Sequence, residues 1–434
     1  MAAVAAVVVA LVVGASVTWL VTDRHLSAER GSPDAQRTSE PTGGQLTGKA
    51  AVRRQDDVRR LLQQRSDAVM AKDRDAFLAL VDPAAERFRK RQATVFDRLV
   101  RIPLASWEYD YSGEGPAMSG YNASLLPEGA FVARVVLRYT FEGSTSPVET
   151  QQFLTLVPRG GRWLIAGDRD NVQGAQSGVF GRDIWELGPV SVVHGRSSLV
   201  IGNASRKALR AYARHADRAV RDVDRVWDAT WSRRPVVIVP RTQADMALVV
   251  GTPARGLDQI AAVTTGYSAA GPTNGDRVVI NPAAWRELVA EGRRVVMTHE
   301  VTHLATRATT YGSVPIWMAE GFADYVAYEA VDIPVEVGAE TVLRQVRNGR
   351  GPRELPGDTD FDPARGDIAP AYEASWLAAR MIAESYGERR LVRLYVAMAA
   401  DDDTTAERDI EDVLGITEKR LVREWRSFMS AAAA

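Results

Sequence analysis

Two histidines spaced four residues apart in a helical segment constrain this 434-residue chain more than any other feature. The stretch from Arg293 to Arg307 predicts a helix, with His299 and His303 on one face and one turn apart. Both imidazoles can therefore bind one metal ion. Glu300 is rotated by about 100° from His299, so its carboxylate lies beside such an ion, where it can accept a proton from metal-activated water.

A third ligand is expected from a second helix that begins near Trp317. This helix offers Glu320, seventeen positions after His303, and Asp324 one turn later. Two imidazoles and one carboxylate leave the fourth position of a zinc ion open, as in catalytic sites. We therefore predict one Zn²⁺ ion held by His299, His303 and Glu320. Asp324 is expected to accept a hydrogen bond from the other ring N–H of His299, the alternative being an aspartate at the surface.

Together these segments resemble the gluzincin zinc metallopeptidases of the peptidase MA clan, whose catalytic domains are thermolysin-like or aminopeptidase-N-like. The resemblance covers roughly residues 275–400. In the aminopeptidase-N-like branch a tyrosine at the start of a later helix stabilises the oxyanion, and the match at Ala371–Ser375 makes Tyr372 the candidate. The hallmark Trp-x-x-Glu-Gly-Phe-Ala-x-Tyr is matched by Trp317, Glu320, Gly321, Phe322, Ala323 and Tyr325.

The chain also departs from that branch. The spacing from His303 to Glu320 is two residues shorter than is usual for the branch, and Ala319 stands where the branch commonly has Asn. No Gly-x-Met-x-Asn motif precedes the metal helix. Aminopeptidases use that motif to hold the free amino terminus of a substrate. We therefore do not extend the exopeptidase activity of the branch to this chain.

The resemblance implies a zinc-dependent hydrolase of peptide or protein substrates, either an endopeptidase or a peptidase of unknown specificity. Zinc and Tyr372 would hold the oxyanion, while Glu300 would act as the general base and then protonate the leaving amine. The alternative is a catalytically idle zincin-fold protein that serves as a binding or scaffold module of the cell envelope. The intact Glu300 favours the enzyme.

Composition excludes several other classes of function. Lys and Arg number 54 against 55 Asp and Glu, so the net charge of -1 gives no reason to expect nucleic acid as a partner. The absence of cysteine excludes thiolate ligands and thiolate nucleophiles. A metal must therefore be held by His, Asp or Glu.

The amino-terminal segment is expected to reach a membrane. Residues 2–21 carry no charge and are long enough to span the bilayer, which predicts a single-pass anchor within residues 1–22. Arg24, Arg30 and Arg37 follow this segment, and the positive-inside rule alone would keep that flank in the cytoplasm. By resemblance to exported bacterial peptidases, we nevertheless expect an extracytoplasmic catalytic domain. A cleaved signal peptide and a secreted protein are the alternative.

An α+β fold is expected for the rest of the chain. Residues 23–50 are rich in Ser, Gly, Pro and Thr and predict a flexible linker. Residues 51–175 predict helices followed by an antiparallel sheet, a pattern that resembles the small cone of nuclear-transport-factor-like proteins and suggests a binding or spacer module. Residues 180–434 predict the zincin-type domain, with a mixed sheet and a mostly helical carboxyl-terminal part.

Three further features of the second domain remain open at this point. The strand at Arg277–Asn281 precedes the metal helix and either pairs with an extended substrate as an edge strand or belongs to the core of the sheet. The segment Asn348–Pro370, rich in Gly, Pro and Asp, predicts a loop near the cleft that could act as a lid. His194 and His215 have no ligand partner at helical spacing, so no functional role is expected for them.

Overall fold

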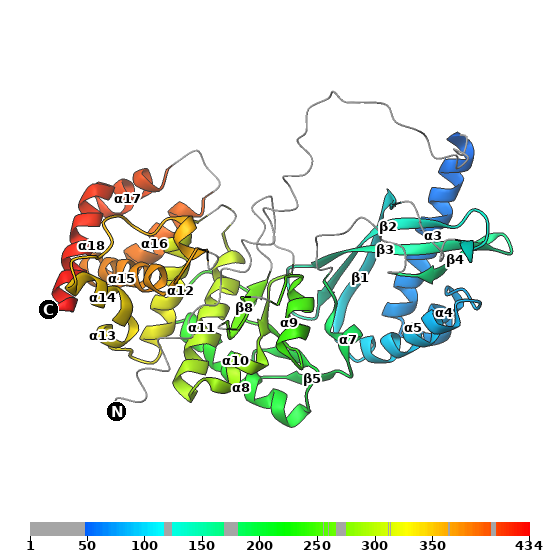
Figure 1. Cartoon of the computed structure of the whole chain (residues 1–434), viewed down its shortest axis with the longest axis horizontal. Helices are drawn as coiled ribbons and strands as arrows, with labels where there is room; N and C mark the ends of the chain where they lie inside the picture. Colours follow the sequence, from blue (N-terminus) through cyan, green and yellow to red (C-terminus); the bar gives the residue numbers. More distant parts are fainter. Residues whose placement is uncertain are drawn as a thin grey trace. The chain divides into compact units, whose positions relative to one another are not determined.

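The computed structural model describes residues 48–116, 124–168, 181–265 except 255 and 259, 275–362 except 311 and 313, 365–400 and 405–434 (Figure 1). The described residues form two compact units, one that ends at Val190 and one from Ser191 to Ala434. The expected membrane segment and most of the expected linker lie outside the described residues, and both stay predictions. Among the described helices, none combines the length and the apolar character that a membrane span requires.

The first unit places helices before a sheet, as expected. Its described strands form an antiparallel sheet in the order β1-β2-β3-β4 (Figure 1). The first helix begins at Gly48, inside the stretch expected to be linker. The elements are α3 (Gly48–Met70), α4 (Arg74–Ala79), α5 (Glu86–Leu99), β1 (Leu104–Glu114), β2 (Phe131–Phe141), β3 (Val148–Arg159), β4 (Arg162–Gly167) and α7 (Ile184–Leu187).

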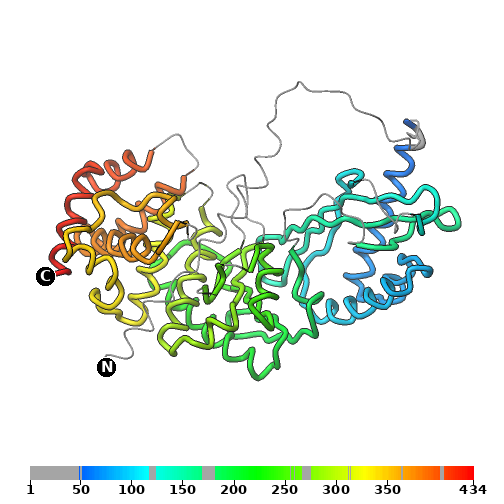
Figure 2. The backbone as a smooth tube through the Cα atoms, viewed as in Figure 1, coloured from blue at the N-terminus to red at the C-terminus, as the bar shows by residue number. Residues whose placement is uncertain are grey.

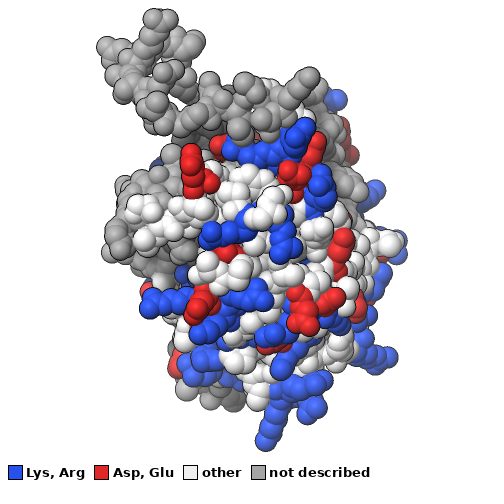
Figure 3. All heavy atoms as spheres, turned by 90° about the vertical axis from the view of Figure 1, so that its right-hand side faces the viewer, with Lys and Arg blue, Asp and Glu red and all other residues white. Residues whose placement is uncertain are grey.

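Buried and exposed side chains alternate along the strands, and the buried ones form the core of this unit. On β2, Ala133 and Val135 are buried while Arg134 between them is exposed, because successive side chains point to opposite faces of a sheet. Leu61 and Leu62 of α3 pack into the same core cluster. The outer surface carries charges of both signs, and the face shown in Figure 3 has Lys and Arg interspersed with Asp and Glu.

The second unit is built on a mixed sheet, which agrees with the expected fold class. Its described strands run in the order β5-β6-β7-β9-β8, in which the β6–β7 and β7–β9 pairs are parallel and the β5–β6 and β8–β9 pairs are antiparallel. The elements are β5 (Ser191–His194), β6 (Leu199–Gly202), β7 (Val236–Val239), β8 (Ala262–Thr265) and β9 (Arg277–Ile280).

The suggestion that Arg277–Asn281 forms the edge strand is wrong. This segment is β9, and it lies between β7 and β8 with all four strand residues buried. Within the described residues, the strand at this edge of the sheet is β8, which pairs with β9 in the antiparallel direction. The core alternative for Arg277–Asn281 is therefore the one observed.

Helices make up the rest of the second unit, and those from α12 onward gather in its carboxyl-terminal part, from yellow to red in Figure 2. The largest core cluster of the chain runs through these helices and the sheet. The helices are α8 (Arg206–Val223), α9 (Gln243–Val250), α10 (Pro282–Glu287), α11 (Ala290–Arg307), α12 (Ile316–Glu329), α13 (Val335–Gly338), α14 (Glu340–Arg347), the 3₁₀ turn η1 (Asp358–Phe361), α15 (Ala369–Tyr386), α16 (Glu388–Met398), α17 (Ala406–Leu414) and α18 (Glu418–Ala433).

Helices α12 and α15 approach each other closely at Gly321. A Cβ atom placed on Gly321 would lie 2.4 Å from the backbone oxygen of Ser375, which is far inside van der Waals contact. Only a residue without a side chain permits this approach. The glycine of the Trp-x-x-Glu-Gly segment therefore sets the distance between the helix that carries Glu320 and the helix that begins near Tyr372.

We expect Gly321→Ala to destabilise the second unit by about 1–3 kcal/mol, the usual range for overpacking a core contact. The measurement is the free energy of unfolding in denaturant. Gly292→Ala is the matched control, because its Cβ would meet only the side chain of Leu288, at 3.2 Å, and alanine favours the helix. Equal stability of Gly321→Ala and wild type would contradict the assigned role of the glycine.

Candidate metal centre

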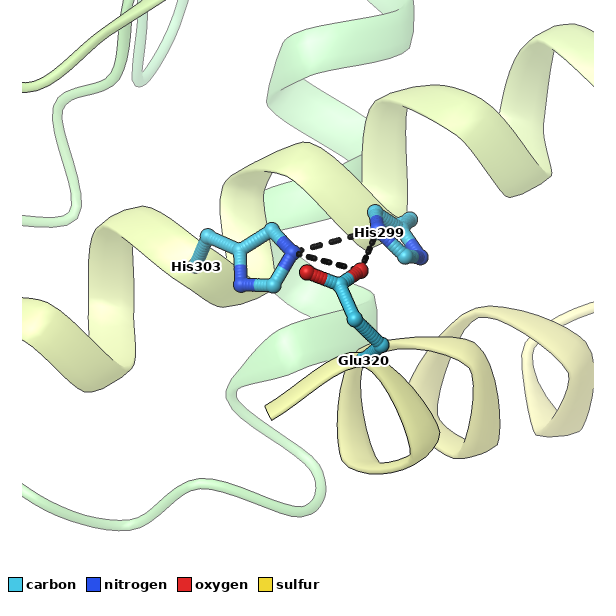
Figure 4. Close-up of side chains that lie close together, drawn as sticks. All are labelled: His299, His303 and Glu320. Atoms are coloured by element: carbon cyan, nitrogen blue, oxygen red, sulfur yellow. Dashed lines mark hydrogen bonds and ion pairs between the residues drawn. The ribbon is translucent and has the colours of Figure 1, made fainter. Parts of the chain in front are cut away.

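Helix α11 delivers two histidines into the protein interior. From Val295 to Thr306 every residue of the helix is buried, so each polar side chain there needs a partner inside the protein. Thr302 meets this need locally, because its hydroxyl donates to the backbone oxygen of Thr298 at 2.8 Å. His299 and His303 instead turn toward α12 (Figure 4).

Glu320 of α12 completes a triad with the two histidines. The Nε2 atoms of His299 and His303 lie 3.1 Å apart, and the Oε2 atom of Glu320 lies 3.3 Å from the first and 3.5 Å from the second (Figure 4). All three side chains are buried. They form a group of the kind that can hold a metal ion, with one ligand atom from each residue.

These separations fit one tetrahedral ion. Ligand atoms about 2.0–2.2 Å from a zinc ion and at tetrahedral angles lie about 3.3–3.6 Å from one another. The observed range of 3.1–3.5 Å is nearly the same. The three residues therefore already have the geometry of three zinc ligands, and this His-x₃-His…Glu group could hold a metal ion.

Asp324 lies where it can orient His299. Its Oδ1 atom is 2.7 Å from Nδ1 of His299, and both groups are buried. With Nδ1 as the donor in this hydrogen bond, the lone pair of the ring remains on Nε2, which faces His303 and Glu320. The carboxylate thus selects the nitrogen that is available to a metal.

The pKa values of the three triad side chains indicate that protons and a metal cation compete for the same ligand atoms. Burial alone would lower the pKa of His299, but the carboxylates of Asp324 and Glu320 raise it well above its usual value. Burial lowers the pKa of His303. Burial also opposes ionisation of Glu320, yet the two imidazoles lower its pKa to about 2. Metal binding must therefore displace a proton, and its affinity falls as the pH falls.

Glu300 is held by a residue that the sequence did not single out. Glu300 is fully buried, and its Oε2 atom accepts a hydrogen bond of 2.6 Å from the hydroxyl of Thr264 on β8. The same hydroxyl lies 3.0 Å from the backbone oxygen of Glu300. Oε1, the other carboxylate oxygen, is buried without a hydrogen-bond partner among the described residues.

The contact between Thr264 and Glu300 could not be inferred from the sequence around Thr264. The strand Ala262–Thr265 is only four residues long, and nothing in so short a segment indicates which residue faces a helix thirty-six positions later. Burial of a β-branched hydroxyl beside a carboxylate emerges only when the order of the strands is known.

Tyr372 lies in the first turn of α15 and is buried. Its ring meets that of Phe361 edge-on, with centroids 5.2 Å apart. Phe361 belongs to η1 within the expected loop Asn348–Pro370, and it anchors that segment to α15. The structure brings the metal ligands, Asp324 and Glu300 together on α11 and α12, while the role of Tyr372 stays a prediction.

Comparison with known proteins gives matches at the level of structure. No protein-family model and no curated protein matches the sequence. Among matching solved structures is yeast LTA4 hydrolase in complex with bestatin, with 11% identity and a TM-score of 0.32 over 56% of this chain and 39% of that one. Another is an M1 zinc metallopeptidase mutant from Deinococcus radiodurans bound to a Tyr-Ser-Ala substrate, with 13% identity and a TM-score of 0.32 over 74% and 61%.

This chain therefore spans less than two thirds of the length of either structure. It is similar to M1 zinc metallopeptidases and carries the His299, His303 and Glu320 triad. With identities and TM-scores this low, the interpretation of the site rests on its own geometry.

Asp324→Asn should weaken zinc binding about 10- to 100-fold, the usual effect of losing a carboxylate that orients a ligating histidine. Competition between the protein and a chelating dye for zinc measures the change. Glu329→Gln, at an exposed position of the same helix, is the control and should keep wild-type affinity. Equal zinc affinity in all three proteins would show that Asp324 does not orient His299.

Thr264→Val should lower kcat about 10- to 100-fold, the cost of losing a hydrogen bond to a charged group, with KM and zinc content unchanged. The rate measured is that of peptide-bond cleavage, the activity that the sequence resemblance implies. Thr264→Ser, which keeps the hydroxyl, should restore most of the rate. Thr265→Val is the control, because among the described residues the Thr265 hydroxyl donates to the backbone oxygens of Gly275 and Arg277 and not to Glu300. A loss of zinc in Thr264→Val would indicate a structural role instead.

Proposed function

We propose that this chain is a zinc-dependent hydrolase of peptide bonds in peptides or proteins. The observation that carries the proposal is the convergence of three zinc-ligand atoms, 3.1–3.5 Å apart, next to a buried carboxylate that has one free oxygen. A structural zinc site has four protein ligands, whereas a site with three leaves room for water and substrate.

His299, His303 and Glu320 would hold the metal. A zinc ion bound there supplies Lewis-acid polarisation of a carbonyl group and activates water near neutral pH. Asp324, through its 2.7 Å contact with Nδ1, keeps Nε2 of His299 on the side of His303 and Glu320, where it could bind the metal. The burial of all these groups excludes bulk water, and their electrostatic interactions gain strength in the low-dielectric interior.

Glu300 handles the proton. Its Oε1 atom has no hydrogen-bond partner among the described residues and can accept the proton of water as the oxygen attacks the carbonyl carbon. The hydroxyl of Thr264 holds Oε2, so the carboxylate has one defined oxygen for proton transfer. The same proton then passes to the leaving amine as the C–N bond breaks, and water has been added across the peptide bond.

Tyr372 is proposed to stabilise the oxyanion. A phenol hydroxyl can donate one hydrogen bond to the developing negative charge. Support comes from the position of Tyr372 in the first turn of α15. This helix contacts α12 at Gly321, the residue that follows Glu320.

The test is cleavage of a diverse peptide library by the zinc-loaded protein, read by mass spectrometry. Wild type should cleave a subset of peptides. Glu300→Gln should retain zinc but lose at least about a hundredfold in rate, as expected for removal of a general base, and His303→Ala should lose both zinc and activity. If wild type and Glu300→Gln are equally inert while both bind zinc, the enzyme proposal must be abandoned.

A further inference from the structure

Helix α8 carries a basic face on the surface of the second unit. Six cationic side chains of this helix are exposed. Because successive residues are rotated by about 100°, all of them lie within an arc of about 120° around the helix axis. This arc is called the basic face, and its residues are Arg206, Lys207, Arg210, Arg214, Arg218 and Arg221.

The acidic residues of α8 do not neutralise the basic face. The helix contains two, Asp217 and Asp222. The carboxylate of Asp217 accepts hydrogen bonds from the backbone N–H groups of Arg196 and Ser197. Asp222 is buried and accepts two hydrogen bonds, of 2.8 and 2.9 Å, from the guanidinium of Arg294 on α11. Within the described ranges, none of the six cations forms an ion pair.

Overall composition does not account for this concentration of positive charge. Lys and Arg number 54 in the whole chain, against 55 Asp and Glu. On α18 the two signs are mixed, and Arg420 pairs with Glu424 at 2.8 Å. On α8, in contrast, the exposed charges of one sign gather on one side of the helix.

The charge of the basic face also acts on its neighbour His215. Burial lowers the pKa of His215, and the guanidinium groups of Arg218, Arg293 and Arg214 act in the same direction, which brings the pKa to about 4. Arg293 belongs to α11. The positive potential around α8 is therefore reinforced from the adjacent helix.

The opposite side of α8 fixes the basic face to the body of the second unit. Leu209, Ala213 and Val220 are buried in the large core cluster, and the pair between Asp222 and Arg294 joins α8 to α11. The six cations are therefore held along one side of a packed helix rather than on a flexible segment.

The chemistry of the basic face fits a partner with dense negative charge and little shape. Among the described residues of α8, no large apolar side chain is exposed. Stable protein interfaces have an apolar centre, and single-stranded nucleic acids bind through stacking on aromatic side chains. The basic face offers neither, so charge alone must supply its affinity.

We propose that the basic face of α8 binds the surface of an anionic lipid bilayer. Anionic headgroups attract Lys and Arg side chains that come within a Debye length of the surface. The anchor predicted within residues 1–22 would hold the same chain at a bilayer. A tether of this kind raises the effective concentration of the surface, so a contact made by charge alone suffices.

The approach of α8 to a bilayer can be measured because the full chain contains no cysteine. Ala211→Cys places a fluorophore between Lys207 and Arg214, at the border of the basic face. The labelled full chain is added to phosphatidylcholine vesicles with or without phosphatidylglycerol, and a nitroxide on the lipid headgroups quenches a fluorophore at the surface. Ser430→Cys, at an exposed position of α18, carries the control label.

Quenching at Ala211→Cys should require phosphatidylglycerol. It should disappear in about 1 M NaCl, where the Debye length is only about 3 Å, and the label at Ser430→Cys should be quenched less. Equal quenching at both labels, or equal quenching with and without phosphatidylglycerol, would overturn the proposal. Release of the chain from the vesicles by duplex DNA of equal charge would also overturn it, in favour of a nucleic-acid partner.

A charge-matched pair of variants assigns the contact to α8. The test variant combines Arg206→Gln, Arg210→Gln, Arg214→Gln and Arg218→Gln. The control variant removes the same charge from exposed positions of α16 and α18 and combines Arg389→Gln, Arg390→Gln, Arg393→Gln and Arg426→Gln. The ratio of docked to undocked chains should fall at least about 100-fold in the test variant, because each basic residue near an anionic surface contributes a several-fold factor.

The control variant should dock nearly as wild type does. An equal loss in both variants would show that net charge, and not the basic face, determines docking, and the proposal would fail. His303→Ala should dock as wild type does, since the basic face shares no residue with the metal centre. The outcome is therefore independent of the peptidase proposal.

Discussion

One buried hydrogen bond, between Nδ1 of His299 and Asp324, joins the two helices that carry all three metal ligands. It decides which ring nitrogen faces Glu320 and His303, and it does so in an interior where neither partner can turn to water instead. The remaining contacts of the centre depend on this orientation. A ring turned the other way would direct an N–H at the place where a cation must bind.

The centre is also part of the hydrophobic core. Helix α11 has no solvent-exposed face between Val295 and Thr306, so its imidazoles and carboxylate share the interior with apolar side chains such as Val301 and Leu304. The apolar surroundings strengthen the charge interactions within the site and also make each unpaired polar atom costly. Oε1 of Glu300, which has no hydrogen-bond partner among the described residues, is one such atom, and the proposed catalysis gives a reason for it to persist.

The metal ligands could be predicted because helical geometry links residues four positions apart, and because Glu320 lies in a distinctive segment. Which strand forms the edge of the sheet could not be predicted, because the order of strands depends on long-range pairing rather than on the local pattern of β9. Thr264 was missed for the same reason.

At the contact between Gly321 and Ser375, the backbones of α12 and α15 meet without a side chain of Gly321 between them. A close backbone contact of this kind has no rotamer to adjust, so it resists a displacement of one helix against the other at this point. Glu320, the neighbour of Gly321 on α12, is therefore held close to α15 at Ser375. On the other side of Glu300, the link to the sheet is a side-chain hydrogen bond from Thr264 on β8, so for the proposed hydrolase this contact has more freedom to adjust than the one at Gly321.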